Sequence, residues 1–156
     1  MSLMQKLVGT AVLLCAAIAL AAAPRHAAPK TLAQSPEPMP AFHEQAPKGQ
    51  LPPTVNPLSF PDTLVQNAYI VAARVKKTLY QEPCYCHCDQ SQGHGSLLDC
   101  FVSQHGAGCN ICMAEDFYTY EQLKKDKTAA QIREGIIQGE WQKVDLKKYQ
   151  SPLPTK

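Results

Sequence analysis

Six cysteines between residues 84 and 112 are the side chains of this sequence whose type and spacing could carry chemistry. Cys84, Cys86 and Cys88 alternate with other residues, Cys100 follows alone, and Cys109 and Cys112 form a C-x-x-C pair. Soft thiolate ligands select Cu(I), zinc or iron-sulfur clusters, and closely spaced thiolates can share an ion. The spacing therefore indicates a soft-metal site, with copper as the preferred ion and zinc as the second.

Three histidines, His87, His94 and His105, lie in the same segment and could add nitrogen ligands. His105 joins the six cysteines in the predicted ligand set. A surface or hydrogen-bonding role is the alternative for each histidine. In an extended segment Cys84, Cys86 and Cys88 would share one face, and His87 would point away from them.

A disulfide framework is a second interpretation, because an even number of cysteines in a small exported domain is typical of one. Bonding within a C-x-C pair is awkward, since extended Cα atoms two residues apart lie near the upper limit for a bridge. The economical pairing would join the first three cysteines to the last three. The protein would then be a disulfide-stapled interaction module.

Thiol-disulfide redox chemistry is the third interpretation, and it rests on Cys109 and Cys112 at an expected helix start. The positive end of a helix dipole favours a thiolate there. Cys88 or Cys100 would be the resolving partner. The strand-helix-strand pattern of thioredoxin-like enzymes is missing, so an enzyme is not the favoured interpretation. Met113 stands where covalent haem attachment requires a histidine.

The first 21 residues have the pattern of a secretory signal peptide. Lys6 precedes an uncharged apolar run over residues 7–20, and small residues allow cleavage after Ala21. We therefore expect an exported protein, periplasmic or otherwise extracytoplasmic, where thiols pair or hold a metal. An uncleaved anchor is the alternative and would be its expected membrane contact. Lipidation at Cys15 is disfavoured, because bulky Leu14 precedes it.

Composition divides the rest of the chain into three parts. Residues 22–60 are rich in proline and alanine and predict a disordered tether, because they lack periodic apolar residues. Residues 61–145 predict the cysteine-rich domain, and residues 146–156 a polar tail. The formal net charge of +2 and the missing basic stripe exclude a nucleic-acid partner. The expected partners are a metal ion and another exported metal-handling or redox protein.

Helical periodicity and capping signals predict an all-α domain, a small bundle of about four short helices around a cysteine-rich loop. The expected helices cover residues 62–80, 96–102, 110–126 and 129–138. Pro83 should stop the first helix, and Gly139 the last. A domain this small generally needs staples or a metal to supplement its core.

The runs Pro83-Cys84-Tyr85-Cys86-His87-Cys88 and His105-Gly106-Ala107-Gly108-Cys109-Asn110-Ile111-Cys112-Met113 resemble an exported bacterial family named for its PCYCGC or CYCXC motif. The resemblance implies a small exported protein or lipoprotein without a settled activity. Some relatives are described as selenoproteins near the motif, which implies redox or soft-metal chemistry. His87 replaces the usual glycine, so the resemblance leaves the loop's backbone path open.

Overall fold

Helix α1, Thr63–Leu79, begins where the sequence predicts it. The carboxylate of Asp62 accepts a hydrogen bond from the backbone N-H of Val65 at 3.1 Å and caps the helix. One face of α1 is buried, at Val65, Ala68, Val71, Ala72, Val75 and Leu79. This helical period lets α1 supply one wall of the core.

The computed structural model describes residues 38–153, which all lie in one compact unit of the chain, Pro36–Lys156. The predicted signal peptide, Cys15 and the first part of the predicted tether lie outside the described residues. Within the described part of the chain, all regular structure is helical, so the predicted all-α fold is confirmed. No helix in residues 38–153 is both long and apolar enough to span a bilayer.

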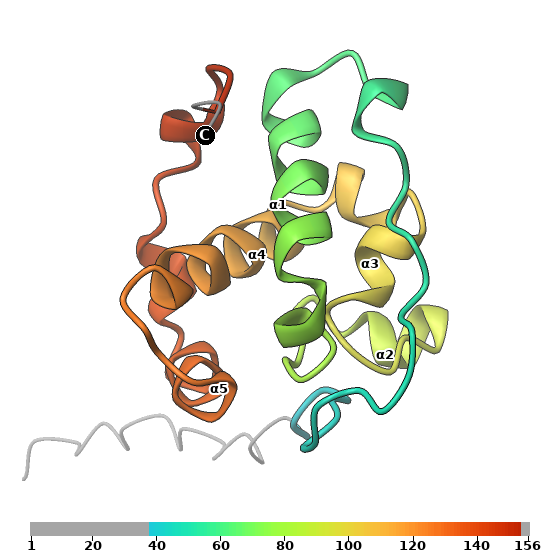
Figure 1. Ribbon diagram of the computed structural model, residues 1–156, viewed down its shortest axis with the longest axis vertical. Coiled ribbons are helices and arrows are strands. Elements are labelled where there is room, and N and C mark those ends of the chain that lie inside the picture. The colour runs from blue at the N-terminus through green and yellow to red at the C-terminus, as the bar shows by residue number, and fades with distance from the viewer. Residues whose placement is uncertain (1–37, 154–156) are drawn as a thin grey trace, which may run out of the picture. The chain divides into compact units, whose positions relative to one another are not determined.

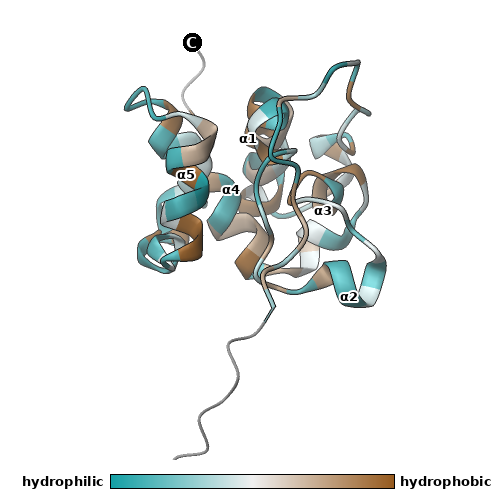
Figure 2. Cartoon of the chain, turned by 90° about the horizontal axis from the view of Figure 1, so that it is seen from below, coloured by the Kyte–Doolittle hydropathy of each residue, from teal (hydrophilic) through white to brown (hydrophobic). Residues whose placement is uncertain are grey.

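Helix α4, Asn110–Leu123, is the central element of this unit. Its residues 112–119 are all buried, so α4 is covered on every side. It crosses α1, with α5 (Ala129–Ile137) on one side and α2 (Cys88–Gln92) and α3 (Asp99–Val102) on the other (Figure 1). Figure 2 shows hydrophobic segments gathered between α1 and α4, with hydrophilic residues on the outer side of α5. Cys112, in the first turn of α4, therefore lies inside the core.

Four short 3-10 helices complete the described chain. They are η1 (Pro57–Ser59), η2 (His105–Gly108), η3 (Glu140–Lys143) and η4 (Leu146–Tyr149). Helix α5 has the capping box that its sequence indicates, in which Thr128 and Gln131 bond each other's backbone N-H groups. Gly139 follows α5 with φ 73°, a conformation that glycine adopts without strain.

Two helices in the cysteine-rich segment differ from the prediction. The loop expected to be irregular contains α2, and the helix expected from Ser96 begins at Asp99. Ser96 is buried, and its hydroxyl has no hydrogen-bond partner in the described structure. The backbone N-H groups of Leu97 and Leu98 instead bond the carbonyls of Glu82 and Leu79 at the end of α1. These bonds hold the returning chain against α1.

Residues 38–60, the described part of the predicted tether, lie along the domain. The backbone N-H of Val55 donates to the carbonyl of Phe101 at 2.9 Å, and that of Ala41 donates to Asp89 at 3.3 Å. Leu51, Val55 and Phe60 pack on the core. Their apolar side chains are isolated among prolines, so no helical or strand periodicity in the sequence predicts this packing. We call residues 38–60 the strap.

The predicted polar tail also contributes to the core. Tyr149 is buried and stacks on Phe117 with ring centroids 3.6 Å apart. Its hydroxyl donates to Glu121 at 2.8 Å, and Asn67 donates to the carbonyls of Tyr149 and Ser151. Tyr149, a single aromatic residue among lysines, therefore anchors to the core a segment that its composition predicts to be solvent-exposed.

Three carboxyl groups, those of Glu82, Glu115 and Asp116, are fully buried. Both oxygens of Glu82 and of Asp116 lack a hydrogen-bond partner within the described residues. Burial raises the pKa of Glu82 to about 8, an effect that the positive charge of Arg133 partly offsets. Burial also raises the pKa values of Glu115 and Asp116 well above their usual range. These side chains favour the neutral form inside the protein.

The raised pKa of Glu82 predicts a pH-dependent stability. Between the usual carboxyl value of 4.5 and about 8, the unfolded chain releases the Glu82 proton and the folded chain retains it. The folded state therefore loses stability as pH rises through this window. Replacing Glu82 with glutamine removes the ionisable group. We expect E82Q to gain a few kcal/mol relative to wild type at pH 8.5, at ~1.4 kcal/mol per pKa unit, and little at pH 4.5.

Urea unfolding of the reduced, metal-free protein at the two pH values measures this difference. The exposed carboxylate Glu44 provides the control variant E44Q, which should follow wild type at both values. A constant difference between E82Q and wild type from pH 4.5 to 8.5 would contradict the prediction.

Candidate metal centre

The segment after α1 turns back on itself and does not run extended. The backbone N-H of His87 donates to the carbonyl of Cys84 at 3.1 Å, and His87 is left-handed with φ 54°. Cys88 then begins α2. The expectation that Cys84, Cys86 and Cys88 share one face of an extended segment is therefore wrong. The turn, and not strand alternation, brings their sulfurs together.

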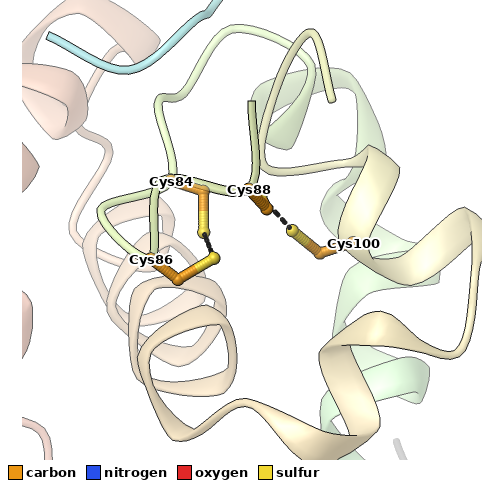
Figure 3. Close-up of side chains that lie close together, drawn as sticks. All are labelled: Cys84, Cys86, Cys88 and Cys100. Carbon is orange, nitrogen blue, oxygen red and sulfur yellow. Dashed lines mark hydrogen bonds between the residues drawn. The ribbon is translucent and has the colours of Figure 1, made fainter. Parts of the chain in front are cut away.

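Four sulfur-sulfur contacts lie within the cysteine-rich segment or join it to α3 and α4. The Sγ atoms of Cys84 and Cys86 lie 3.3 Å apart, and those of Cys88 and Cys100 lie 3.4 Å apart (Figure 3). Cys112, in the first turn of α4, places its Sγ 3.5 Å from that of Cys84 and 3.6 Å from that of Cys86. The Sγ atoms of Cys84, Cys86, Cys88 and Cys100 also lie within 4.8 Å of one another. These five cysteines, which are spread over 29 residues of sequence, therefore form one cluster, which we call the sulfur cluster.

All six cysteines of the described chain are free thiols. The contact distances exceed a disulfide bond, which is about 2.05 Å long. The predicted pairing of the first three cysteines with the last three is not found among these residues.

Two groups of donor atoms in the cluster have the spacing of a metal site. One contains Cys84, Cys86, Cys88 and Cys100, and the other contains Cys86, Cys100, Cys112 and His105. The donor atoms of each group lie within 4.8 Å of one another. A zinc ion with Zn-S distances near 2.3 Å sets tetrahedral ligands roughly 3.8 Å apart. The cluster can therefore hold a metal ion.

Two of the three histidines contact cysteine sulfurs. His105 lies with Nε2 3.6 Å from Cys86 Sγ, which agrees with its place in the predicted ligand set. His94, absent from that set, has Nδ1 3.2 Å from Cys88 Sγ and 3.4 Å from Cys100 Sγ. His87 contacts Gln90 and the ring of Tyr85. The fold of α2 brings His94 back to Cys88. The position of His94 in the sequence therefore does not predict this contact.

Cys109 occupies a different position from the other predicted ligands. It is the N-cap of α4, and its Sγ accepts a hydrogen bond from the backbone N-H of Cys112 at 3.5 Å. It belongs to neither donor group. The C-x-x-C pair thus lies at a helix start, as predicted, but Cys112 contacts the loop cysteines and Cys109 caps the helix.

Hydrogen bonds among the thiols determine which of them is most acidic. Bonds from Cys100, Cys109 and Cys112 hold the pKa of Cys86 below its usual range. Bonds with Cys112, Cys84 and Cys88 lower the pKa of Cys100. The donors Cys84, Cys88 and Cys112 have raised pKa values, because their bonds stabilise the thiol. Cys86, which accepts in each of its hydrogen bonds with the other thiols, is therefore the preferred thiolate.

The sulfur cluster is closed on one side and open on the other. Cys84, Cys88, Cys100 and Cys112 are at most 2% exposed. Cys86, Cys109 and His105 are half-buried. An ion could therefore reach the cluster through the half-buried side without passing through the core.

Glu115 is a positioning residue that sequence reasoning missed. Its Oε1 accepts a hydrogen bond from the backbone N-H of Tyr85 at 2.8 Å and so holds the cysteine loop on α4. Its carboxyl group also contacts the thiol of Cys84. A glutamate in a helix is usually solvated, and nothing in the sequence distinguished this one.

A comparison with protein families finds a match over most of the chain. A family described as "Protein of unknown function with PCYCGC motif" matches residues 11–154, which is most of the chain. The chain has no significant match among curated proteins or among solved structures.

The left-handed backbone of His87 explains the glycine in that motif. The motif's fifth position is glycine, and this chain has His87 there. A side chain in this conformation costs about 1–2 kcal/mol, which glycine avoids. The histidine therefore keeps the glycine path at some cost in stability.

The variants H87G and H87A test this explanation. Both lose the imidazole, but only H87G relieves the backbone. We expect H87G to be about 1 kcal/mol more stable than H87A in urea unfolding of the reduced protein. Equal stabilities, or a less stable H87G, would show that the loop does not need the left-handed conformation.

Proposed function

The chain belongs to the PCYCGC-motif family, and we propose that its sulfur cluster binds a soft metal ion, with Cu(I) preferred and zinc second. The proposed role is metal carriage, buffering or structural retention. One observation supports this most directly: two groups of four donor atoms, each within 4.8 Å, form in a region where all six cysteines are free.

The donor types favour Cu(I). Five of the six donors in the two groups are sulfurs, and soft thiolates match a soft monovalent ion. Zinc accepts both donor compositions, since four cysteines and three cysteines with one histidine are common structural zinc shells. Metal binding would also reduce the electrostatic repulsion between neighbouring buried thiolates, which is strong away from water.

The exposure of the ligands supports carriage or buffering. Cys86 and His105 lie on the half-buried side, where a partner's ligands could reach a bound ion. Transfer by successive exchange of ligands would begin at these two. The proposed recipient or donor is another exported metal-handling or redox protein.

Export itself is part of the proposal. It rests on the N-terminal sequence, which lies outside the described residues. In a periplasmic or other extracytoplasmic compartment, unprotected thiols tend to oxidise. A bound soft ion would keep its cysteine ligands reduced there.

A Cu(I) titration of the full chain, reduced and anaerobic, tests metal binding. We expect stoichiometric uptake against a competing Cu(I) chelator. C100S should weaken the affinity by more than about tenfold, because Cys100 belongs to both donor groups. The matched control is C15S, the same change at the one cysteine outside the described residues. Parallel titration with zinc ranks the ions, and no uptake of either ion would refute the proposal.

Thiol-disulfide exchange is the second candidate function. The sulfur pairs Cys84-Cys86 and Cys88-Cys100 lie 3.3 and 3.4 Å apart, so small movements could bring either pair to bonding distance. The C-x-x-C pair Cys109 and Cys112 remains its predicted reactive pair. An external oxidant would take the two electrons and two protons lost per disulfide.

Alkylation of the denatured, unreduced protein taken from its own compartment separates these functions. If the cysteines hold a metal, all six should be alkylated once the ion is removed by a chelator, which intact mass measures. Six unreactive cysteines would indicate a disulfide-stapled module. A mixture of reduced and oxidised molecules that interconvert with a thiol buffer would favour redox exchange.

A further inference from the structure

The two donor groups of the sulfur cluster overlap. They share Cys86 and Cys100, and each group adds two donors of its own. Cys84 and Cys88 belong only to the first group, and Cys112 and His105 only to the second. Together the groups supply six donors.

One ion cannot use all six donors. Zinc in structural sites takes four ligands, and a monovalent soft ion takes no more. A single ion in the first group would leave Cys112 and His105 unused, although Cys112 Sγ lies within 3.6 Å of two sulfurs of that group. The arrangement thus has more ligands than one ion needs.

A thiolate has several lone pairs and can bind two soft ions at once. Two four-donor groups with two members in common are two coordination shells that share an edge. The second ion then requires only one additional thiolate, that of Cys112, because Cys86 and Cys100 are shared and His105 is neutral. The ionic charge per metal in this buried site therefore falls when the second ion binds, which limits the cost of burying charge.

Resting on the proposed function, the geometry points to a polynuclear site: the sulfur cluster binds at least two Cu(I) ions, and the Sγ atoms of Cys86 and Cys100 bridge them. The terminal donors are Cys84 and Cys88 for one ion, and Cys112 and His105 for the other.

The positions of the two bridging residues fit this assignment. Cys100 is fully buried in α3, with its Sγ 3.4 Å from that of Cys88 and within 4.8 Å of the donors of both groups. Cys86 lies on the half-buried side, with contacts to Cys84, Cys112 and His105. His94 Nδ1, 3.4 Å from Cys100 Sγ, can stabilise a bridging sulfur by a hydrogen bond. Each bridging sulfur thus lies close to terminal donors of both groups.

The experiment is an anaerobic Cu(I) titration of the reduced full chain, followed by native mass spectrometry and by X-ray absorption at the copper edge. We expect species with two or more copper ions to form at the expense of the apo form, with little singly loaded protein. We also expect a copper-copper scattering distance short enough for a shared sulfur edge.

Variants separate bridging ligands from terminal ones. C86S and C100S should lose the copper-copper signal and bind one ion fewer. C84S makes the same cysteine-to-serine change at a terminal donor. It should bind copper more weakly but keep the copper-copper signal. C15S should match wild type in both measurements. Circular dichroism of the apo variants shows whether each retains its helices, and the wild-type measurements test the proposal even where a variant unfolds.

The outcomes distinguish this inference from the proposed function. Saturation of the wild type at one copper ion would overturn the polynuclear site and leave soft-metal binding intact. Two ions without a copper-copper signal would overturn the bridges. A signal that survives in both C86S and C100S would do the same. No uptake of Cu(I) or zinc would refute the proposed function, and the polynuclear site with it.

Discussion

The contacts of Cys112 with Cys84 and Cys86 join the two halves of the cysteine pattern, and the positions of the other ligands depend on them. Cys112 is fixed in the first turn of the most deeply buried helix, α4. The loop after α1 has no regular structure of its own before Cys88, so it takes its position from this helix. The hydrogen bond from Tyr85 N-H to Glu115, one turn further along α4, holds the loop in the same place.

Burial of acidic groups around these sulfurs is the main electrostatic constraint on the fold. Thiols and carboxyl groups that lie close together away from water cannot all carry charge. The protein resolves this by sharing protons among the thiols and by keeping its buried carboxyl groups neutral. A cation would fit the same environment for the same reason, since it neutralises thiolates that the interior otherwise disfavours.

The sequence predicts α1 and α5 well, because local signals for both stand in the sequence. The single buried face of α1 leaves a clear period, and α5 has a capping box at Thr128. The strap was not predictable in this way, because its contacts come from isolated residues and from backbone groups such as Val55 N-H. The convergence of the cysteines was expected, but its cause was not. The convergence depends on the left-handed turn at His87, and a histidine does not by itself predict that conformation.

The strap also has a consequence for where the domain can be divided. Pro40 is buried, and Pro40 and Ala41 lie beside Cys84, Cys88 and His94 at the closed side of the cluster. A fragment trimmed at residue 61, where composition places the boundary, would lose the hydrogen bond to Phe101 and expose these donors to solvent oxidants. We therefore expect an intact form of this domain to begin at or before Pro40. Any recombinant or natural shortening beyond that point would convert a protected cluster into an oxygen-sensitive one.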